Sequence, residues 1–126
     1  MKIAYGVFII ISLIIILSVG SYYIISYYSE KITQDLDRLN NYILQEKWGK
    51  AQNLMDNLNK TYNRGELFFT VFINHEEFKD LKTIIARLSS LVKLEDKKEI
   101  LPEITVAREL VRSIPEQEIL NIKNIF

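Results

Sequence analysis

The chain divides into two parts by the spacing of its apolar residues. The run from Ile3 to Tyr28 contains no charged residue, whereas the rest of the chain mixes apolar and charged positions with a helical period. As a helix the uncharged run would be ~39 Å long, enough to cross a hydrocarbon core of about 30 Å with some tilt. The remaining residues are too few to bury an all-round apolar rod of this length. The run is therefore predicted to be a transmembrane helix.

Tyrosines mark both ends of this run. Tyr5 lies near one end, and the other end holds Tyr22, Tyr23, Tyr27 and Tyr28. Aromatic rings with a polar group are favoured at the two membrane–water interfaces. The positions of the tyrosines therefore agree with a membrane span.

The same run also resembles a secretory signal, because Lys2 precedes it and Ser18-Val19-Gly20 offers small residues for cleavage. The apolar character continues beyond that point, through Tyr22 to Ile25. A cleaved signal would end its apolar region earlier, so we expect the segment to be retained as an anchor.

Lys2 and the amino terminus are the only charges on the short side of the span. Long downstream domains are translocated largely regardless of their own charge. We therefore expect a single-pass protein of the cell membrane, with a cytoplasmic N-terminus and an extracytoplasmic C-terminal domain. The expected units are an anchor of residues 1–29, which meets the bilayer through residues 3–28, and a domain of residues 30–126.

Four stripes of apolar residues recur in the second part at spacings of three and four, and each predicts one amphipathic helix. Glycine and proline are scarce there, which favours helices over strands. We therefore expect an all-α fold, with the transmembrane helix followed by a short antiparallel bundle of three to four helices, arranged as two stacked helical hairpins. The stripes are Ile32, Leu36, Leu39 and Ile43; Trp48, Ala51, Met55, Leu58 and Tyr62, continued by Phe69 and Phe72; Phe78, Leu81, Ile85, Leu88 and Val92; and Ile100, Ile104, Ala107, Val111 and Ile114.

Two of these helices have a start signal. Asn74 and Asp96 each stand three residues before a glutamate, which is the spacing of a capping box. The join between Gln45 and Gly49 is less defined, and predicts either a tight turn or a bend within one long helix. The segment 68–73 has the composition of a strand, but a lone strand is not viable, so we expect it to be helical.

Two prolines bear on the fourth helix. Ile114-Pro115 should end it, because the residue before a proline is pushed out of the helical region. Pro102 should kink the helix or delay its start. The tail after Pro115 is apolar, and we expect it to pack into a seam of the bundle; the alternative is that it binds something else. Its apolar residues are Ile119, Leu120, Ile122, Ile125 and Phe126.

The residues that could carry chemistry do not form a recognisable site. The 16 basic and 16 acidic residues balance, with no basic run, which argues against nucleic acid as a partner, and there is no cysteine. His75 is the only histidine, and adjacent helical positions such as Glu76 and Glu77 point about 100° apart, so these residues do not converge on a metal. We therefore interpret them as a solvated first helical turn.

The carboxylate pairs Asp35/Asp37 and Glu116/Glu118 are likewise interpreted as solvated charge. No glycine-rich phosphate loop and no nucleophile elbow is present in the sequence. We expect no catalytic, cofactor-binding or metal-binding residue, no cofactor and no enzymatic activity.

Aromatic residues offer possible docking points. Trp48 is of a type enriched at binding hot spots, but it is in phase with a helical stripe and is expected to be core. Phe68, Phe69 and Phe72 are also expected to be core, although an exposed patch there would mark a docking surface.

Several short motifs along the chain resemble the domain-of-unknown-function family 4363, which comprises small single-span membrane proteins of spore-forming Gram-positive bacteria. The motifs are Trp48, Phe72-Ile73-Asn74-His75-Glu76-Glu77, Ile114-Pro115-Glu116 and Asn124-Ile125-Phe126. The resemblance covers essentially the whole chain and implies an anchored helical domain. It implies no catalytic residues, and Pro102 is a departure from the uninterrupted fourth helix that it implies.

Two functions fit these expectations. The first is a membrane-anchored, non-enzymatic interaction or structural protein of the cell envelope, with another envelope protein as partner. The second is a sensor or binding module that holds a small ligand in an apolar slot between helices. An exposed apolar patch would favour the first, and polar residues lining an internal pocket would favour the second.

Overall fold

The structure is a computed structural model that describes the backbone of residues 1–72 and 75–125 and the side chains of residues 1–67 and 76–116. It contains four helices: α1 (Lys2–Leu44), α2 (Trp48–Phe72), α3 (His75–Lys93) and α4 (Lys97–Ile125). The described residues form no strand. The predicted all-α class is confirmed, and so is the helical state of the strand-like segment up to Phe72.

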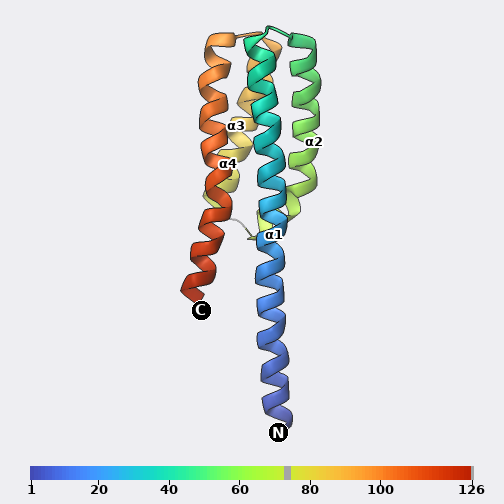
Figure 1. Ribbon diagram of the computed structural model, residues 1–126, viewed down its shortest axis with the longest axis vertical. Helices are drawn as coiled ribbons and strands as arrows, with labels where there is room; N and C mark the ends of the chain where they lie inside the picture. Colours follow the sequence, from blue (N-terminus) through green and yellow to red (C-terminus); the bar gives the residue numbers. More distant parts are fainter. Residues whose placement is uncertain (73–74, 126) are drawn as a thin grey trace.

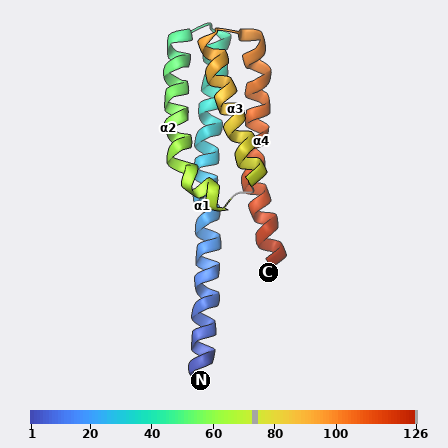
Figure 2. The ribbon, with the colours of Figure 1, turned by 180° about the vertical axis from the view of Figure 1, so that it is seen from behind.

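The helices form an antiparallel bundle in which each helix runs opposite to the one before it (Figure 1). Helix α1 packs against α2 and α4, and α3 packs against the same two helices. We call the end with the α1–α2 and α3–α4 turns the tip and the end with the α2–α3 connection the base. The N-terminal half of α1 protrudes far beyond the base, as both views show (Figures 1 and 2).

The predicted apolar stripes build the core. Their described members are buried, except that Trp48 and Phe78 are partly buried and pack against the others. Burial of each large side chain contributes about 1.5–3 kcal/mol, so this core is the main source of stability. The residues buried below 2 % exposure are Ile25, Ile32, Leu36, Leu39, Ile43, Leu58, Leu81, Leu88, Ile100, Ile104 and Ile114, together with the smaller Ala51, Ala107, Val92 and Val111. The side chains of Phe69 and Phe72 lie outside the described part.

Helix α1 crosses the expected boundary between residues 29 and 30 without a break. It has 43 residues and is therefore ~65 Å long. Its buried stripe begins at Ser21 and Ile25, inside the predicted span, and continues to Ile43. The protruding half and the bundle half of α1 are thus one helix with no linker between them.

The join between the first two stripes is a tight turn, and the alternative of one bent helix is wrong. The Lys47 N–H donates to the Tyr42 carbonyl at 2.9 Å and the Glu46 N–H donates to Ile43 at 3.1 Å, while Glu46 has a φ of 56°. This is a Schellman ending, in which the residue after the helix adopts the left-handed conformation. Such turns usually have glycine at that position, which explains why the sequence pattern did not settle the join.

The turn from α3 to α4 repeats this geometry. The Asp96 N–H donates to the Leu91 carbonyl at 3.2 Å, and Glu95 has a φ of 55°. Asp96 also caps α4 as predicted, because its carboxylate accepts a bond from the Glu99 N–H at 3.3 Å. The predicted cap at Asn74 lies outside the described residues.

The structure corrects the expectation about Pro115 and excludes one of the two alternatives for Pro102, the delayed start. The helix begins at Lys97, so Pro102 does not delay its start. Pro102 removes one hydrogen bond to the Lys98 carbonyl, but both residues are exposed, so water can bond that carbonyl. Pro115 does not end the helix, which continues to Ile125. The expected packing of the tail side chains into a seam concerns side chains outside the described part.

The strained glutamates of the two turns give a test of this geometry. Replacing Glu95 with glycine should stabilise the fold by about 1 kcal/mol, because a residue with a side chain is disfavoured by about that amount at positive φ. Thermal unfolding of the full chain in detergent micelles, followed by circular dichroism, measures the change.

The matched control is Ala86→Gly at an exposed position within α3. Glycine inside a helix should lower stability by about 1 kcal/mol, so the two substitutions should act in opposite directions. If Glu95→Gly also destabilises the protein, the left-handed turn is not formed.

Candidate functional site

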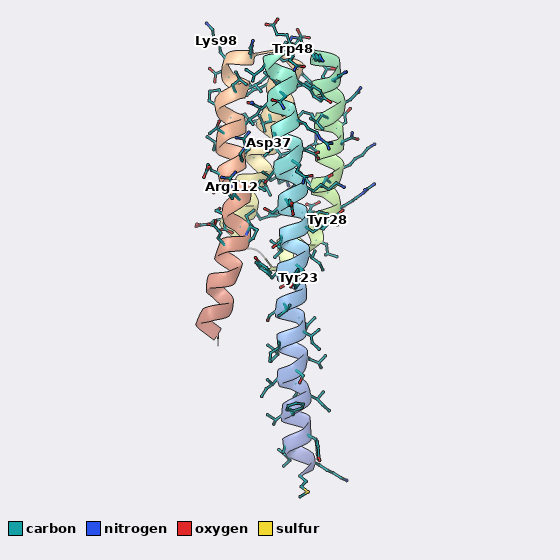
Figure 3. The ribbon with its side chains drawn as sticks, viewed as in Figure 1. Tyr23, Tyr28, Asp37, Trp48, Lys98 and Arg112 are labelled. Carbon is teal, nitrogen blue, oxygen red and sulfur yellow. The ribbon has the colours of Figure 1, made fainter. Side chains whose placement is uncertain are left out.

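The most distinctive surface of the protein is the protruding half of α1. Large apolar side chains from Ile3 to Val19 are exposed on all its sides, for example 84 % at Ile3 and 63 % at Leu17. Figure 3 shows these side chains projecting around the helix with no other helix beside its first turns. Of the described helices, α1 alone is long and apolar enough to cross a membrane. Exposed apolar surfaces of this size mark sites that contact a membrane or another protein.

Tyrosines surround α1 where it enters the bundle. Tyr22 and Tyr23 are in edge contact with centroids 6.0 Å apart, and Tyr27 and Tyr28 at 5.4 Å. Tyr23 and Tyr27 are exposed, whereas Tyr28 packs against the core, and Figure 3 marks Tyr23 and Tyr28 at this level. These residues therefore form a ring of amphipathic side chains between the apolar half of α1 and the bundle.

A buried hydrogen bond joins α1 to α4 at the same end of the bundle. The Ser29 hydroxyl donates to the carbonyl of Val111 at 2.8 Å, and both residues are buried. In a regular helix this carbonyl would accept a bond from the N–H of residue 115, but that residue is Pro115, which has no N–H. Ser29 therefore supplies the donor that the proline removes.

This bond explains how α4 continues through Pro115. A buried carbonyl without a donor costs about 1–3 kcal/mol, and the serine on the neighbouring helix removes that penalty. Sequence reasoning missed this pair. Its signal is a serine within the apolar stripe of one helix and a proline within the stripe of another, but pairing them requires the register between α1 and α4.

The structure separates the carboxylates of the first predicted pair. Asp35 is only 8 % exposed, so the expectation that it is solvated is wrong. Burial raises its pKa above the usual value of 3.8, and the cations of Arg38 and Lys31 only partly oppose this effect. The Arg38 contact is long, at 3.9 Å, and Arg38 itself is mostly exposed. Asp35 is thus a buried carboxylate with weak compensation.

Asp37 points to a different neighbour. Its carboxylate lies 2.7 Å from the guanidinium of Arg108, so the pair links α1 to α4 (Asp37 is labelled in Figure 3). A second interhelical pair joins Arg87 of α3 to Glu103 of α4 at 3.0 Å. One member of each pair is exposed and the other is partly buried. Half-exposed pairs of this kind contribute little to stability, but they favour one register of the helices.

The structure describes only some of the remaining candidates. His75 begins α3, but its side chain lies outside the described part, and Glu76 is exposed on the first turn. Glu116 is exposed, and the side chain of Glu118 lies outside the described part. Within the described residues, no group of three or more metal-ligating side chains is present.

Trp48 lies at the tip of the bundle, where it is labelled in Figure 3. It is partly buried and packs against the core, so its interpretation as a core residue is confirmed. The side chains of Phe68, Phe69 and Phe72 lie outside the described part.

Three cavities of the described part are small or open. The first lies between α2 and α3 and has a volume of about 140 Å³, smaller than small-molecule sites, which usually start at about 300 Å³. Its described lining is mainly polar: Gln52, Met55, Asp56, Ser89, Val92 and Lys93. A wider depression has four described lining residues, all from α1: Tyr27, Glu30, Lys31 and Gln34. A third lies between α1 and α2, and it is also mainly polar, with Arg38, Tyr42, Lys50, Asn53, Leu54 and Asn57. None of the three is an apolar slot.

The fold and surfaces define an all-α protein in which a candidate membrane helix continues into an antiparallel four-helix bundle. Comparison with known protein families matches residues 19–125 to the domain of unknown function DUF4363, and the chain belongs to this family. The resemblance drawn from the short motifs is confirmed. No curated protein and no solved structure matches the chain.

The bond between Ser29 and Val111 predicts a specific coupling with Pro115. Ser29→Ala should destabilise the protein by about 1–3 kcal/mol, because it leaves the Val111 carbonyl buried without a donor. In a Pro115→Ala background the restored N–H can bond that carbonyl, so Ser29→Ala should cost clearly less. Unfolding of the four proteins of this double-mutant cycle in detergent micelles measures the coupling.

Ser89→Ala is the matched control, since it removes another interhelical hydrogen bond, from Asn59, away from Pro115. Its effect should add to that of Pro115→Ala within about 0.5 kcal/mol. Additive behaviour of Ser29→Ala as well would show that the serine does not compensate for the proline.

Asp35 predicts a pH-dependent effect. Its folded-state pKa is raised, so the folded protein holds a proton that the unfolded chain releases first, and stability falls as the pH rises from 3.8 through the folded pKa. Asp35→Asn should therefore raise the melting temperature at neutral pH and have a smaller effect below pH 3.8. The control Asp56→Asn is exposed and should change stability by less than about 0.5 kcal/mol at both pH values. An equal effect of Asp35→Asn at both pH values would contradict the proposed burial penalty.

Proposed function

We propose that this protein is a membrane-anchored, non-enzymatic helical interaction or structural protein of the cell envelope. Its α1 helix crosses the bilayer through residues 3–28, its N-terminus is cytoplasmic, and its bundle stands on the extracytoplasmic side. The partner that it binds is another protein of the envelope. The observation that carries the proposal is the order of surfaces along α1. One unbroken helix contains the exposed apolar half, then the tyrosine ring, and then the stripe that packs in the bundle.

The lengths within α1 support the anchor. The stretch Ile3–Tyr22 is ~30 Å long, which equals the thickness of a hydrocarbon core. The ring of tyrosines from Tyr22 to Tyr28 then lies at the interface, where such residues are favoured. On the bundle side of the span, the charged residues of α1 begin beyond this ring, at Glu30 and Lys31.

The alternative of a small-ligand sensor has less support. An apolar slot between helices would appear as a cavity lined by core residues, whereas the three cavities described above are open or small and most of their described lining residues are polar. The core stripes instead fill the space between the helices. A packed core with a varied polar surface supports a protein that presents a fixed shape to a partner.

The tip of the bundle is the part that the anchor holds farthest from the membrane. It exposes two leucines: Leu44, at the end of α1, is 52 % exposed, and Leu94, in the α3–α4 turn, is 74 % exposed. Affinity capture of the intact protein from solubilised membranes, with Leu94→Glu as the variant and Lys82→Glu as the control, tests whether a partner binds there. Loss of a captured protein with the Leu94 variant alone would support the proposal, and equal capture by both would exclude the tip as the binding surface.

The anchor and its orientation are tested together in a bacterial host. The full chain should remain in the membrane fraction after alkaline extraction, and protease added to cells without their walls should remove the bundle. Ile10→Lys combined with Ile14→Lys should reduce membrane insertion, because each charge costs about 2.5–3.5 kcal/mol at the centre of a span. Lys98→Glu at the exposed tip is the control and should leave insertion unchanged.

Release of the parent protein by alkaline extraction would contradict the anchor. Complete protection of the bundle from protease would reverse the orientation. A mature chain that begins at Ser21, measured by mass, would show that the segment is a cleaved signal.

A further inference from the structure

The last turns of α4 lie at the level of the part of α1 that we propose to be in the membrane. The bond from Ser29 to the Val111 carbonyl places these two residues at one level. The two helices run in opposite directions with the same rise per residue, so Ile125, 14 positions after Val111, reaches about 21 Å below Ser29. That is the level of Ile15 in α1.

Of the described helices, only α1 extends to the level of these turns. Helix α2 ends at Phe72 and α3 begins at His75, so their connection marks the base of the bundle. In both views the C-terminal part of α4 continues below this connection and turns away from α1 (Figures 1 and 2). At that depth this segment lies in the same surroundings as α1, which under the proposed anchor are the lipids of the bilayer.

The sequence of the segment is that of an amphipathic helix. Ile119, Ile122 and Ile125 recur at a spacing of three and share one face of the helix. The opposite face is formed mainly by uncharged polar residues, Gln117, Asn121 and Asn124, with Leu120 among them. Glu116 and Lys123 flank the isoleucine face on one side, and Glu118 lies within that face in the first turn of the segment. Charged residues are unfavourable in the centre of a bilayer but are tolerated near its surface, where their side chains can reach water.

The depth of the segment agrees with this composition. If Tyr22 marks the interface, the residue of α4 at its level is Glu118, and Ile125 lies ~10 Å deeper. Helices that lie flat in a membrane surface bury their apolar faces to a similar depth, about 5–10 Å, whereas α4 enters this region end-on, along α1. The segment thus spans the range between the headgroups and the upper acyl chains.

We propose that residues 116–125 of α4 are a second membrane-contacting segment, which lies in the headgroup and upper acyl region of the leaflet on the bundle side. This inference rests on the proposed membrane anchor. Together with α1, the segment attaches the bundle to the bilayer at two points and prevents it from rotating or tilting about α1.

The test uses the absence of cysteine from the chain. A single environment-sensitive fluorophore is attached to Asn124→Cys, and the full chain is reconstituted in vesicles of phosphatidylcholine and phosphatidylglycerol. Lipids with a spin-label quencher near the headgroup or deep in the acyl chain report the depth of the fluorophore. Ile10→Cys in the proposed span and Lys98→Cys at the tip are the references.

We expect the fluorophore at position 124 to be quenched several-fold more by the shallow lipid than the one at position 98, and the one at position 10 to be quenched most by the deep lipid. If position 10 is quenched but position 124 behaves as position 98, the tail is in water and this inference is wrong while the anchor stands. If position 10 is not quenched, the anchor itself is wrong. Strongest quenching of position 124 by the deep lipid would exclude an interfacial location.

A matched pair of variants tests the apolar face. Ile119→Lys with Ile122→Lys should reduce the shallow quenching at position 124, because the face that contacts lipid becomes charged. Gln117→Lys with Asn121→Lys adds the same charge to other positions of the segment and should leave the quenching largely unchanged. Equal loss with both pairs would contradict contact through the isoleucine face.

Discussion

The structure depends on the continuity of α1 between two different environments. Up to Val19 the helix exposes apolar side chains on every side, and from Ser21 it presents one buried stripe to α2 and α4. No proline interrupts this helix, and no connecting loop separates its halves. A helix resists bending because every backbone N–H within it is bonded four residues back. The orientation of one half therefore determines the orientation of the other.

The hydrogen bond between Ser29 and Val111 attaches α4 to this continuous helix. It lies at the base of the bundle, where the core gives way to the tyrosine ring. Pro115 would otherwise leave a buried carbonyl without a donor, and the serine allows α4 to continue beyond the base. Ser29 and Pro115 thus help to set the register of α1 against α4. They also allow α4 to extend toward the apolar half of α1.

The parts of the fold that depend on local pattern were predictable. The four stripes, the cap at Asp96 and the apolar run of α1 are periodic or local signals, and the structure reproduces them. Features that depend on the register between helices were not predictable, because one sequence does not show which residues face each other. For this reason the sequence predicts a solvated Asp35 and an end of α4 at Pro115, and it does not reveal the role of Ser29. The tight turn at Glu46 is one of two alternatives in the sequence, because glutamate rarely adopts the left-handed conformation.

The central claim is that α1 joins the anchor to the bundle as one unbroken helix. Amide hydrogen exchange of the full chain in phospholipid nanodiscs tests it most directly, because exchange reports whether each backbone hydrogen bond is closed. The account predicts slow exchange throughout the segment from Tyr22 to Leu36, which includes the tyrosine ring and the first core residues. A stretch of fast exchange between Tyr22 and Ser29, with protected residues on both sides, would reveal a hinge and would contradict the account.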